Sequence, residues 1–184
     1  MEYNIQLIEK EKWQNYEAHF SDFADSCYSV KISHESNVFS ITMTKEPLLE
    51  RKIIRYPQRL FNSGHADIMV WGVIDGERLV AGIETGIEGW SKNPRLYISL
   101  LWVDDDYKRK GIASALVDIA KKRAVNENLR AVYLDTWSCN EHAIDFYTSQ
   151  GFKLIGFDSC ANSNEDIDKY NVPLKFGYYI KHNK

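Results

Sequence analysis

A short basic loop stands between an apolar segment and an amphipathic one: Lys108, Arg109, Lys110 and Gly111 follow the run 100–103. The first N–H groups of a helix have no partner inside the helix, and the aligned peptide dipoles make that end electropositive. Glycine lacks a Cβ atom and lets the backbone approach a ligand closely. The order of these residues therefore predicts a binding site for a phosphate or pyrophosphate group.

This loop differs from two common phosphate-binding patterns. It lacks the GxxxxGK[ST] spacing of nucleoside-triphosphate loops and the GxGxxG spacing of dinucleotide-binding folds. Both classes are therefore disfavoured. A solvated basic turn without a ligand remains the alternative interpretation.

A second group of polar residues lies in the segment from Asn140 to Phe152. Asn140 stands where a helix N-cap is preferred, and its amide can instead bind a ligand. Tyr147 follows two helical turns later. Its phenol can donate a proton to a leaving group, or it can simply pack in the core.

The elements that position these residues follow from hydrophobic periodicity. Helices are predicted over 9–23, over a segment opened by Pro47 and ended by Pro57, and over 111–126 and 140–150. Strands are predicted over 37–44, 68–74, 78–85, 95–103, 130–136, 152–157 and 175–181, with loops over 86–94 and around the acidic residues 165–168. The pair Asp75-Gly76 predicts a hairpin. The pattern indicates an α/β (α+β) domain, an antiparallel hairpin region followed by β-α-β-α-β.

Composition limits the function classes. The chain has 184 residues and a formal charge of −3, which gives no general signal for nucleic acid and fits a single domain over residues 1–184. It has no apolar run of transmembrane length and no apolar leader segment at its start. Cys27, Cys139 and Cys160 lack CxxC spacing, and the five His residues show no ligand pattern. We expect reduced thiols, a cytoplasmic location, and no metal, membrane or nucleic-acid partner.

Together the two polar segments resemble the GNAT N-acetyltransferases. Residues Lys108 to Ala113 are similar to their acetyl-CoA signature [R/Q]-x-x-G-x-[G/A], and Asn140 to Phe152 are similar to their N-x-x-A-x-x-[F/L]-Y-x-x-x-G-F helix. The resemblance covers about residues 68–158. It implies a GNAT-like fold, a mixed and mostly antiparallel sheet of about six to seven strands with helices on both faces. It also implies an acetyl-CoA-dependent N-acetyltransferase that acts by direct attack of an amine.

The resemblance implies roles for individual residues. Backbone groups of Leu101, Trp102 and Val103 would bind the pantetheine arm, and Asn140 would bind the cofactor near that arm. Tyr147 would lie beside the thioester sulfur and protonate the departing thiolate. The pyrophosphate would be held at the basic loop by Lys108, Arg109, Lys110, Gly111, Ile112, Ala113 and Ser114. Lys108 stands where the signature has Arg or Gln, so a bond made by that side chain is in question.

Acetyl transfer to an amine also needs a base, because an amine with a pKa near ~10 must lose a proton before it attacks. Glu84, on the predicted strand 80–85, is the first candidate; an exposed carboxylate without a role is the alternative. Ser99, Glu88, Asp135 and a chain of water molecules remain further candidates.

Within the family, segments 79–84, 151–158 and 176–179 resemble streptothricin acetyltransferases, which implies a role in antibiotic resistance. A small cationic amine would be suited by the charge of several acidic residues: Glu84, Glu88, Asp158, Glu165, Asp166 and Asp168. The alternative is that these residues form a solvated acidic loop. A protein or polyamine acetyltransferase and a non-catalytic CoA-binding module remain open. A homodimer is a further expectation, formed where the final aromatic strand pairs with a neighbouring copy.

Overall fold

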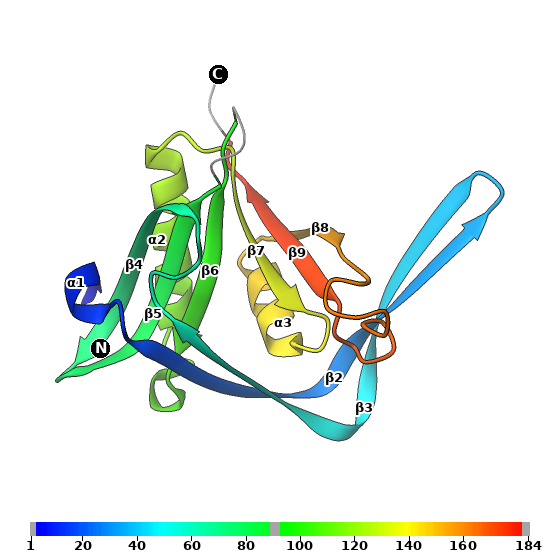
Figure 1. Ribbon diagram of the computed structural model, residues 1–184, viewed down its shortest axis with the longest axis horizontal. Coiled ribbons are helices and arrows are strands. Elements are labelled where there is room, and N and C mark those ends of the chain that lie inside the picture. The colour runs from blue at the N-terminus through cyan, green and yellow to red at the C-terminus, as the bar shows by residue number, and fades with distance from the viewer. Residues whose placement is uncertain (1–2, 89–92, 182–184) are drawn as a thin grey trace. The chain divides into compact units, whose positions relative to one another are not determined.

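The structure, a computed structural model, describes residues 3–88 and 93–181 (Figure 1). Its elements are β1 (Ile5–Leu7), α1 (Lys10–Trp13), β2 (Glu17–Glu35), β3 (Val38–Arg59), β4 (Ala66–Asp75), β5 (Arg78–Ile87), β6 (Leu96–Val103), the 3₁₀ turn η1 (Asp105–Tyr107), α2 (Ile112–Asn126), β7 (Ala131–Trp137), α3 (Glu141–Ser149), β8 (Lys153–Phe157) and β9 (Pro173–Tyr179). Seven strands are hydrogen-bonded in the order β1-β4-β5-β6-β7-β9-β8, and β2 pairs with β3. The predicted mixed sheet of about six to seven strands is confirmed.

The chain divides into two compact units. Unit 1 comprises Met1–Phe20, Tyr56–Leu134 and Gly177–Lys184, and unit 2 comprises Ser21–Arg55 and Asp135–Phe176. Strands β2, β3, β7 and β9 each contribute residues to both. Each unit is described by itself below, and the single domain over residues 1–184 stays a prediction.

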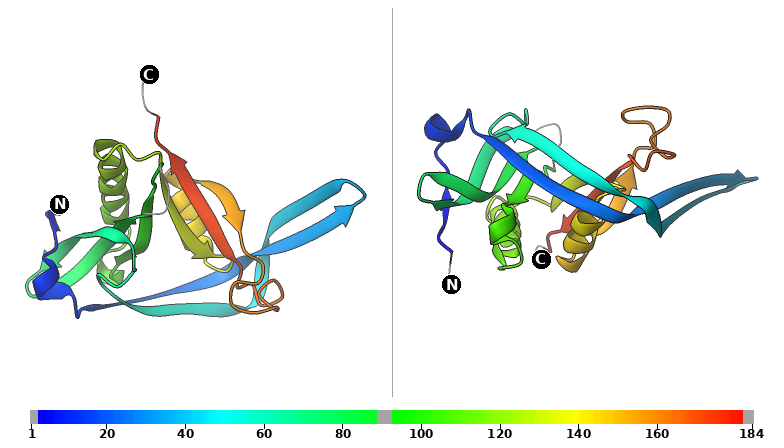
Figure 2. Two further views of the ribbon diagram at one scale, coloured as in Figure 1. Left: turned by 45° about the horizontal axis from the view of Figure 1, so that its top comes forward. Right: turned by 90° about the horizontal axis from the view of Figure 1, so that it is seen from below.

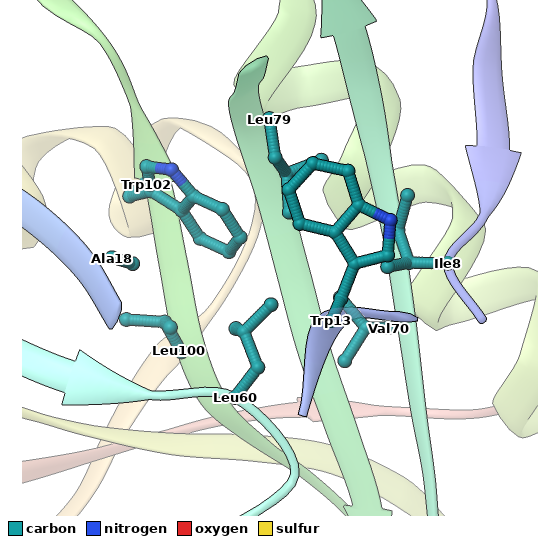
Figure 3. Packing of buried hydrophobic residues seen from close by; sticks show 8 residues of the cluster. All are labelled: Ile8, Trp13, Ala18, Leu60, Val70, Leu79, Leu100 and Trp102. Atoms are coloured by element: carbon teal, nitrogen blue, oxygen red, sulfur yellow. The ribbon is translucent and has the colours of Figure 1, made fainter. Parts of the chain in front are cut away.

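Unit 1 is built on the antiparallel strands β1, β4, β5 and β6, with β7 added in parallel beside β6. One face of β4, β5 and β6 is covered by a buried cluster to which α1 contributes Trp13 (Figure 3). The cluster consists of Ile8, Trp13, Ala18, Leu60, Val70, Leu79, Leu100 and Trp102. Helix α2 packs on β5 and β6 through its own apolar stripe, on the opposite side from α1 (Figure 2).

The predicted elements from residue 68 onward are confirmed within a few residues. The Asp75-Gly76 hairpin joins β4 to β5, and Gly76 adopts the positive φ of 61° that such a turn requires. The predicted helices over 111–126 and 140–150 correspond to α2 and α3. Strand β5 continues through Ile87 into the predicted loop, of which residues 89–92 lie outside the described residues.

Two predicted helices are wrong. The segment 9–23 contains only the four-residue α1 before β2 begins, and the segment between Pro47 and Pro57 lies inside β3. Among the described residues β3 has β2 as its one strand neighbour, and proline is tolerated on such an edge strand because no ladder hydrogen bond is lost at its outer edge. The aromatic spacing that predicted the first helix instead places Trp13 and the partly buried Tyr16 at the core cluster.

The turn end of the β2–β3 ribbon belongs to unit 2 and extends away from α3 (Figure 2). Residues 31–42 are all exposed, and His34 stacks on Phe39 with ring centroids 4.3 Å apart. Because β2 ends at Glu35 and β3 begins at Val38, the same face of the ribbon carries Ile32 and Ile41. This end of the ribbon therefore exposes one apolar face.

Strand β9 lies between β7 and β8, so both of its edges are paired within the chain. The expectation that this final aromatic strand pairs with a second copy is therefore wrong. Among the described residues, no helix is both long enough and apolar enough to cross a lipid bilayer.

Candidate functional site

The basic loop forms a backbone cradle at the start of α2 in unit 1. Arg109 and Gly111 adopt positive φ values of 59° and 82°. Gly111 is the N-cap of α2. Because glycine has no side chain, the cap residue leaves the first N–H groups, those of Ile112 to Ser114, without a side-chain partner from the cap. A Cβ built at Gly111 meets no atom within 4 Å. The predicted anion site therefore has the open space and the free helix end that it needs.

Basic side chains surround this cradle without filling it. Lys108 Nζ lies 2.8 Å from Asp105 Oδ1, and Lys110 Nζ lies 5.2 Å from the centroid of the Tyr107 ring. Arg109 and Lys110 are exposed. An anion at the helix end would thus meet peptide N–H groups and positive charge together.

Strand β6 leads into this cradle with one edge open. Its parallel ladder with β7 joins Leu96–Ile98 to Val132–Leu134, and Leu101 to Val103 lie beyond the last of these pairs. The other edge of this segment pairs with β5, and the Trp102 indole is buried over Gly82. The backbone of Leu101 to Val103, rather than their side chains, is therefore what a ligand along β6 would bind.

Glu84 lies on β5 in unit 1 and has 0% of its surface exposed, so it is not the exposed carboxylate of the alternative interpretation. Its Oε1 accepts a hydrogen bond from Ser99 Oγ at 2.7 Å, and its Oε2 accepts one from the backbone N–H of Phe61, a residue with a φ of 60°. Ser99 itself is half-buried. Two of the predicted base candidates, Glu84 and Ser99, thus form one hydrogen-bonded pair.

The other base candidates have different surroundings. Glu88 accepts two hydrogen bonds from Arg95, at 2.7 and 2.9 Å, and one from Tyr133 Oη at 3.2 Å. Although burial opposes it, the hydrogen bonds and charge of Arg95 hold the pKa of Glu88 below its ordinary value. A carboxylate so neutralised is a poor proton acceptor. Asp135 belongs to unit 2, where its side chain is exposed.

In unit 2, α3 positions Asn140 and Tyr147. Asn140 is the N-cap, and its Oδ1 accepts a hydrogen bond from the Ala143 N–H at 3.2 Å, which leaves the amide nitrogen as a donor. Tyr147 is 8% exposed and packs edge-on against Phe146 and Phe152, with ring centroids 5.3 and 5.7 Å away. Burial raises the pKa of Tyr147, so its phenol keeps its proton at neutral pH.

The acidic loop of unit 2 is partly structural. Asp166 is buried and accepts hydrogen bonds from the Asn162 N–H at 2.8 Å and from Ser163 Oγ at 3.1 Å. These hydrogen bonds hold the pKa of Asp166 below its ordinary value, and the bond from the Asn162 N–H has the largest effect. Glu165 pairs with Lys169, whereas Asp158 and Asp168 are exposed.

The sequence patterns missed the residues that fasten the ribbon to α3. Glu141 accepts hydrogen bonds from the backbone N–H groups of Asp25 and Ser26 at 2.9 and 3.0 Å, and from the Ser26 hydroxyl. Lys45 forms ion pairs with Glu141 and Asp145 at 3.1 and 2.9 Å. In the sequence Glu141 is only a charged residue four positions after the end of β7, and its partners lie more than 90 residues away.

Comparison with known proteins gives consistent matches. The sequence profile described as the acetyltransferase (GNAT) family matches residues 30–152. A streptothricin acetyltransferase of Escherichia coli is 32% identical over 92 residues, which are 50% of this chain and 51% of that protein. The human protein N-acetyltransferase 8 is 37% identical over 65 residues, 35% of this chain and 29% of that one. The chain thus matches about half or less of the length of these curated relatives.

Solved structures share the fold over nearly the whole chain. A Bacillus anthracis protein assigned as a streptothricin acetyltransferase, solved in complex with acetyl coenzyme A, superposes with a TM-score of 0.74 at 21% identity, covering 98% of this chain and 99% of that one. A nourseothricin acetyltransferase superposes with a TM-score of 0.67 at 17% identity, covering 97% and 99%.

Proposed function

The chain belongs to the GNAT acetyltransferase family, and from this we propose that it transfers the acetyl group of acetyl-CoA to an amine of a small cationic substrate. The observation that carries the proposal is the cradle at Gly111. It offers uncapped helix N–H groups, a positive φ and space that a Cβ would occupy, which together suit a pyrophosphate. The acetyl-CoA complex of the Bacillus anthracis relative supports the same donor.

Two segments of unit 1 are proposed to hold the donor. Peptide N–H groups from Arg109 to Ser114 would hold the pyrophosphate, and the open edge of Leu101 to Val103 would pair with the amides of the pantetheine arm. The family resemblance would also assign Asn140 to the donor, through its side-chain amide. Acetyl-CoA supplies an activated thioester, and the remaining work is orientation and proton transfer.

Two proton transfers accompany the reaction. The amine nitrogen forms a bond to the acetyl carbon and loses a proton, for which we propose Glu84 as the acceptor. The C–S bond then breaks, and the departing thiolate needs a proton, for which we propose Tyr147. The raised pKa of Tyr147 suits this role, because a phenol that stays protonated at neutral pH remains a donor.

The substrate class rests on the relatives and on charge. The two full-length structural neighbours and the Escherichia coli relative bear the names of streptothricin or nourseothricin acetyltransferases. The chain has a net charge of −3 and exposed carboxylates such as Asp168, which favour a cationic partner. We therefore propose a streptothricin-like antibiotic as the first substrate to test, with a role in antibiotic resistance.

The test is release of free thiol from acetyl-CoA by the purified chain. The panel contains streptothricin-class antibiotics, aminoglycosides, polyamines and peptides with free amines. Turnover with cationic antibiotics and an acetylated product identified by mass spectrometry are expected. Turnover with peptides or polyamines alone would show that the substrate is one of these amines and not a streptothricin-like antibiotic. If the chain bound CoA but released no thiol from acetyl-CoA with any amine of the panel, we would conclude that it is a non-catalytic CoA-binding module.

A further inference from the structure

Glu84 is a fully buried carboxylate within an otherwise apolar stretch of β5. Its two oxygens accept hydrogen bonds from Ser99 and from the backbone of Phe61. In the part of the chain that the structure describes, no Lys, Arg or His side chain forms an ion pair with it. Burying a carboxylate without a cation destabilises a fold, so an apolar residue would serve a purely structural role better.

Ser99 is the half-buried neighbour that contacts this carboxylate, with Oγ 2.7 Å from Oε1. It is the extra residue of a β-bulge, because Glu84 pairs with Leu100 whereas Thr85 pairs with Ile98. Bulges re-aim side chains and recur beside active sites. Ser99 also directly follows the last residue that pairs with β7.

The position of Ser99 along β6 suits contact with the reacting end of the donor. The proposed pyrophosphate site follows β6, and the proposed pantetheine segment begins at Leu101. The thioester end of the donor therefore points back along β6 toward Ser99. A substrate amine attacking there would meet the Ser99 hydroxyl, whereas the fully buried Glu84 carboxylate offers no exposed surface to meet it.

We propose that Ser99 is a catalytic proton relay that passes the amine proton to Glu84, an inference that rests on the proposed acetyltransferase function. The amine attacks in its neutral form, after its ammonium proton has passed to solvent. As the N–C bond forms, a second proton moves from nitrogen to Ser99 Oγ, and the Ser99 proton moves to Glu84 Oε1. The electron pair of the broken C–S bond leaves with sulfur, which takes a proton from Tyr147. Exchange with solvent then returns the proton from Glu84 to the Tyr147 phenolate, so the protein ends as it began.

A structural role predicts something different for the same pair. If Ser99 only held the bulge, its removal would lower stability and loosen donor binding while the chemical step kept its rate. The bulge has a second anchor, because Arg123 donates to Thr85 O at 3.1 Å and to Thr85 Oγ1 at 2.8 Å. The geometry of β6 is therefore expected to survive the loss of one hydroxyl.

The experiment compares Ser99→Ala, Ser99→Thr, Glu84→Gln and Ser63→Ala with the parent chain. The Ser63 hydroxyl is buried without a hydrogen-bond partner, so its removal is a matched control for deleting a buried serine hydroxyl. For each variant, kcat is measured at saturating substrates, the Kd of CoA is measured by calorimetry, and the melting temperature by circular dichroism. The solvent deuterium isotope effect on kcat is measured for the parent and Ser99→Ala.

We expect Ser99→Ala and Glu84→Gln to lower kcat by roughly 10²-fold or more, the range typical of general base catalysis. Ser99→Ala should keep the CoA Kd within threefold and lose much of the isotope effect, because two protons no longer move together. Ser99→Thr, which keeps a hydroxyl, should recover most of the rate, and Ser63→Ala should resemble the parent. A Ser99→Ala kcat within threefold of the parent, or a loss confined to Kd and melting temperature, would overturn the relay while leaving the acetyltransferase intact. A parent chain that turns over no amine would instead overturn the proposed function and the relay with it.

Discussion

Lys45 on β3 lies 3.1 Å from Glu141 at the first turn of α3, an ion pair that joins the middle of the ribbon to the helix that carries Tyr147. Two backbone N–H groups and the hydroxyl of Ser26 on β2 share the same carboxylate. A negative charge at a helix N-terminus is favourable in addition, because it opposes the helix dipole. Glu141 therefore connects three elements of unit 2 through one side chain.

The first prediction concerns the stability of this connection. Burial opposes ionisation, but the hydrogen bonds from Ser26 and Lys45 lower the pKa of Glu141 from 4.5 to about 2. A group whose folded pKa is lowered stabilises the fold above its unfolded pKa, and this stability is lost as the pH falls toward 2. The shift corresponds to about 3 kcal/mol at neutral pH. Glu141→Gln should therefore lower the free energy of unfolding by roughly that amount at pH 7.

Urea unfolding at pH 7, 4.5 and 2.5 checks this prediction. The difference between the parent and Glu141→Gln should shrink as the pH falls. Glu50→Gln, an exposed change on the same ribbon, is the matched control and should alter stability by less than about 0.5 kcal/mol. A difference between parent and variant that does not change with pH would show that the carboxylate is not the source.

The second prediction concerns Gly111. Gly111→Ala introduces a Cβ at a φ of 82°, which costs about 1–2 kcal/mol of stability, and places that Cβ in the proposed pyrophosphate space. We expect the Kd of CoA to rise at least tenfold in calorimetry. Gly76→Ala is matched to it, because Gly76 also has a positive φ of 61° and open space around its Cβ. Gly76→Ala should lose similar stability and keep the parent Kd of CoA. If Gly111→Ala had the same Kd of CoA as Gly76→Ala, the donor would bind elsewhere.

The features that sequence predicted best are those encoded within a few consecutive residues. The Asp75-Gly76 turn and the Gly111 cradle depend on local backbone preferences, and the structure contains both. Family resemblance then added a mixed, mostly antiparallel sheet of about six to seven strands, whose order only the structure gives. Local patterns also misled, because the spacing of Trp13 and Tyr16 imitates one face of a helix, while these residues instead pack at the core cluster beside the start of a ribbon.

The relationships that sequence did not predict join distant residues. Ser99 and Glu84 meet because a bulge offsets the β5–β6 register by one residue, and no single-strand pattern carries that offset. Glu141 and Ser26 are 115 positions apart, and their contact depends on β2 being a strand rather than a helix. The burial of Glu84 was likewise not predicted, because the sequence left its environment open, whereas the structure encloses it fully.

The third prediction concerns Lys108, the residue that departs from the family signature. Its ammonium is paired with Asp105 on the surface, and such pairs contribute at most about 1 kcal/mol. Peptide N–H groups rather than this side chain form the cradle. Lys108→Gln, which restores a signature residue, should leave the Kd of CoA within threefold at 0.15 M salt. A tenfold change would show that the side chain itself holds the donor.

The last prediction concerns Tyr147 as the acid. Tyr147→Phe removes the proton donor but keeps the ring that packs against Phe146 and Phe152, so the fold and the Kd of CoA should stay close to those of the parent. We expect kcat to fall roughly 10²-fold, the scale of one general acid. Because burial raises the pKa of Tyr147, the parent should show no fall in kcat from phenol ionisation up to about pH 10. Tyr179→Phe, a change at an exposed tyrosine of β9, is the control and should keep the parent rate. If Tyr147→Phe turned over as fast as Tyr179→Phe, the thiolate would leave without protein assistance, and the proton for sulfur would come from solvent.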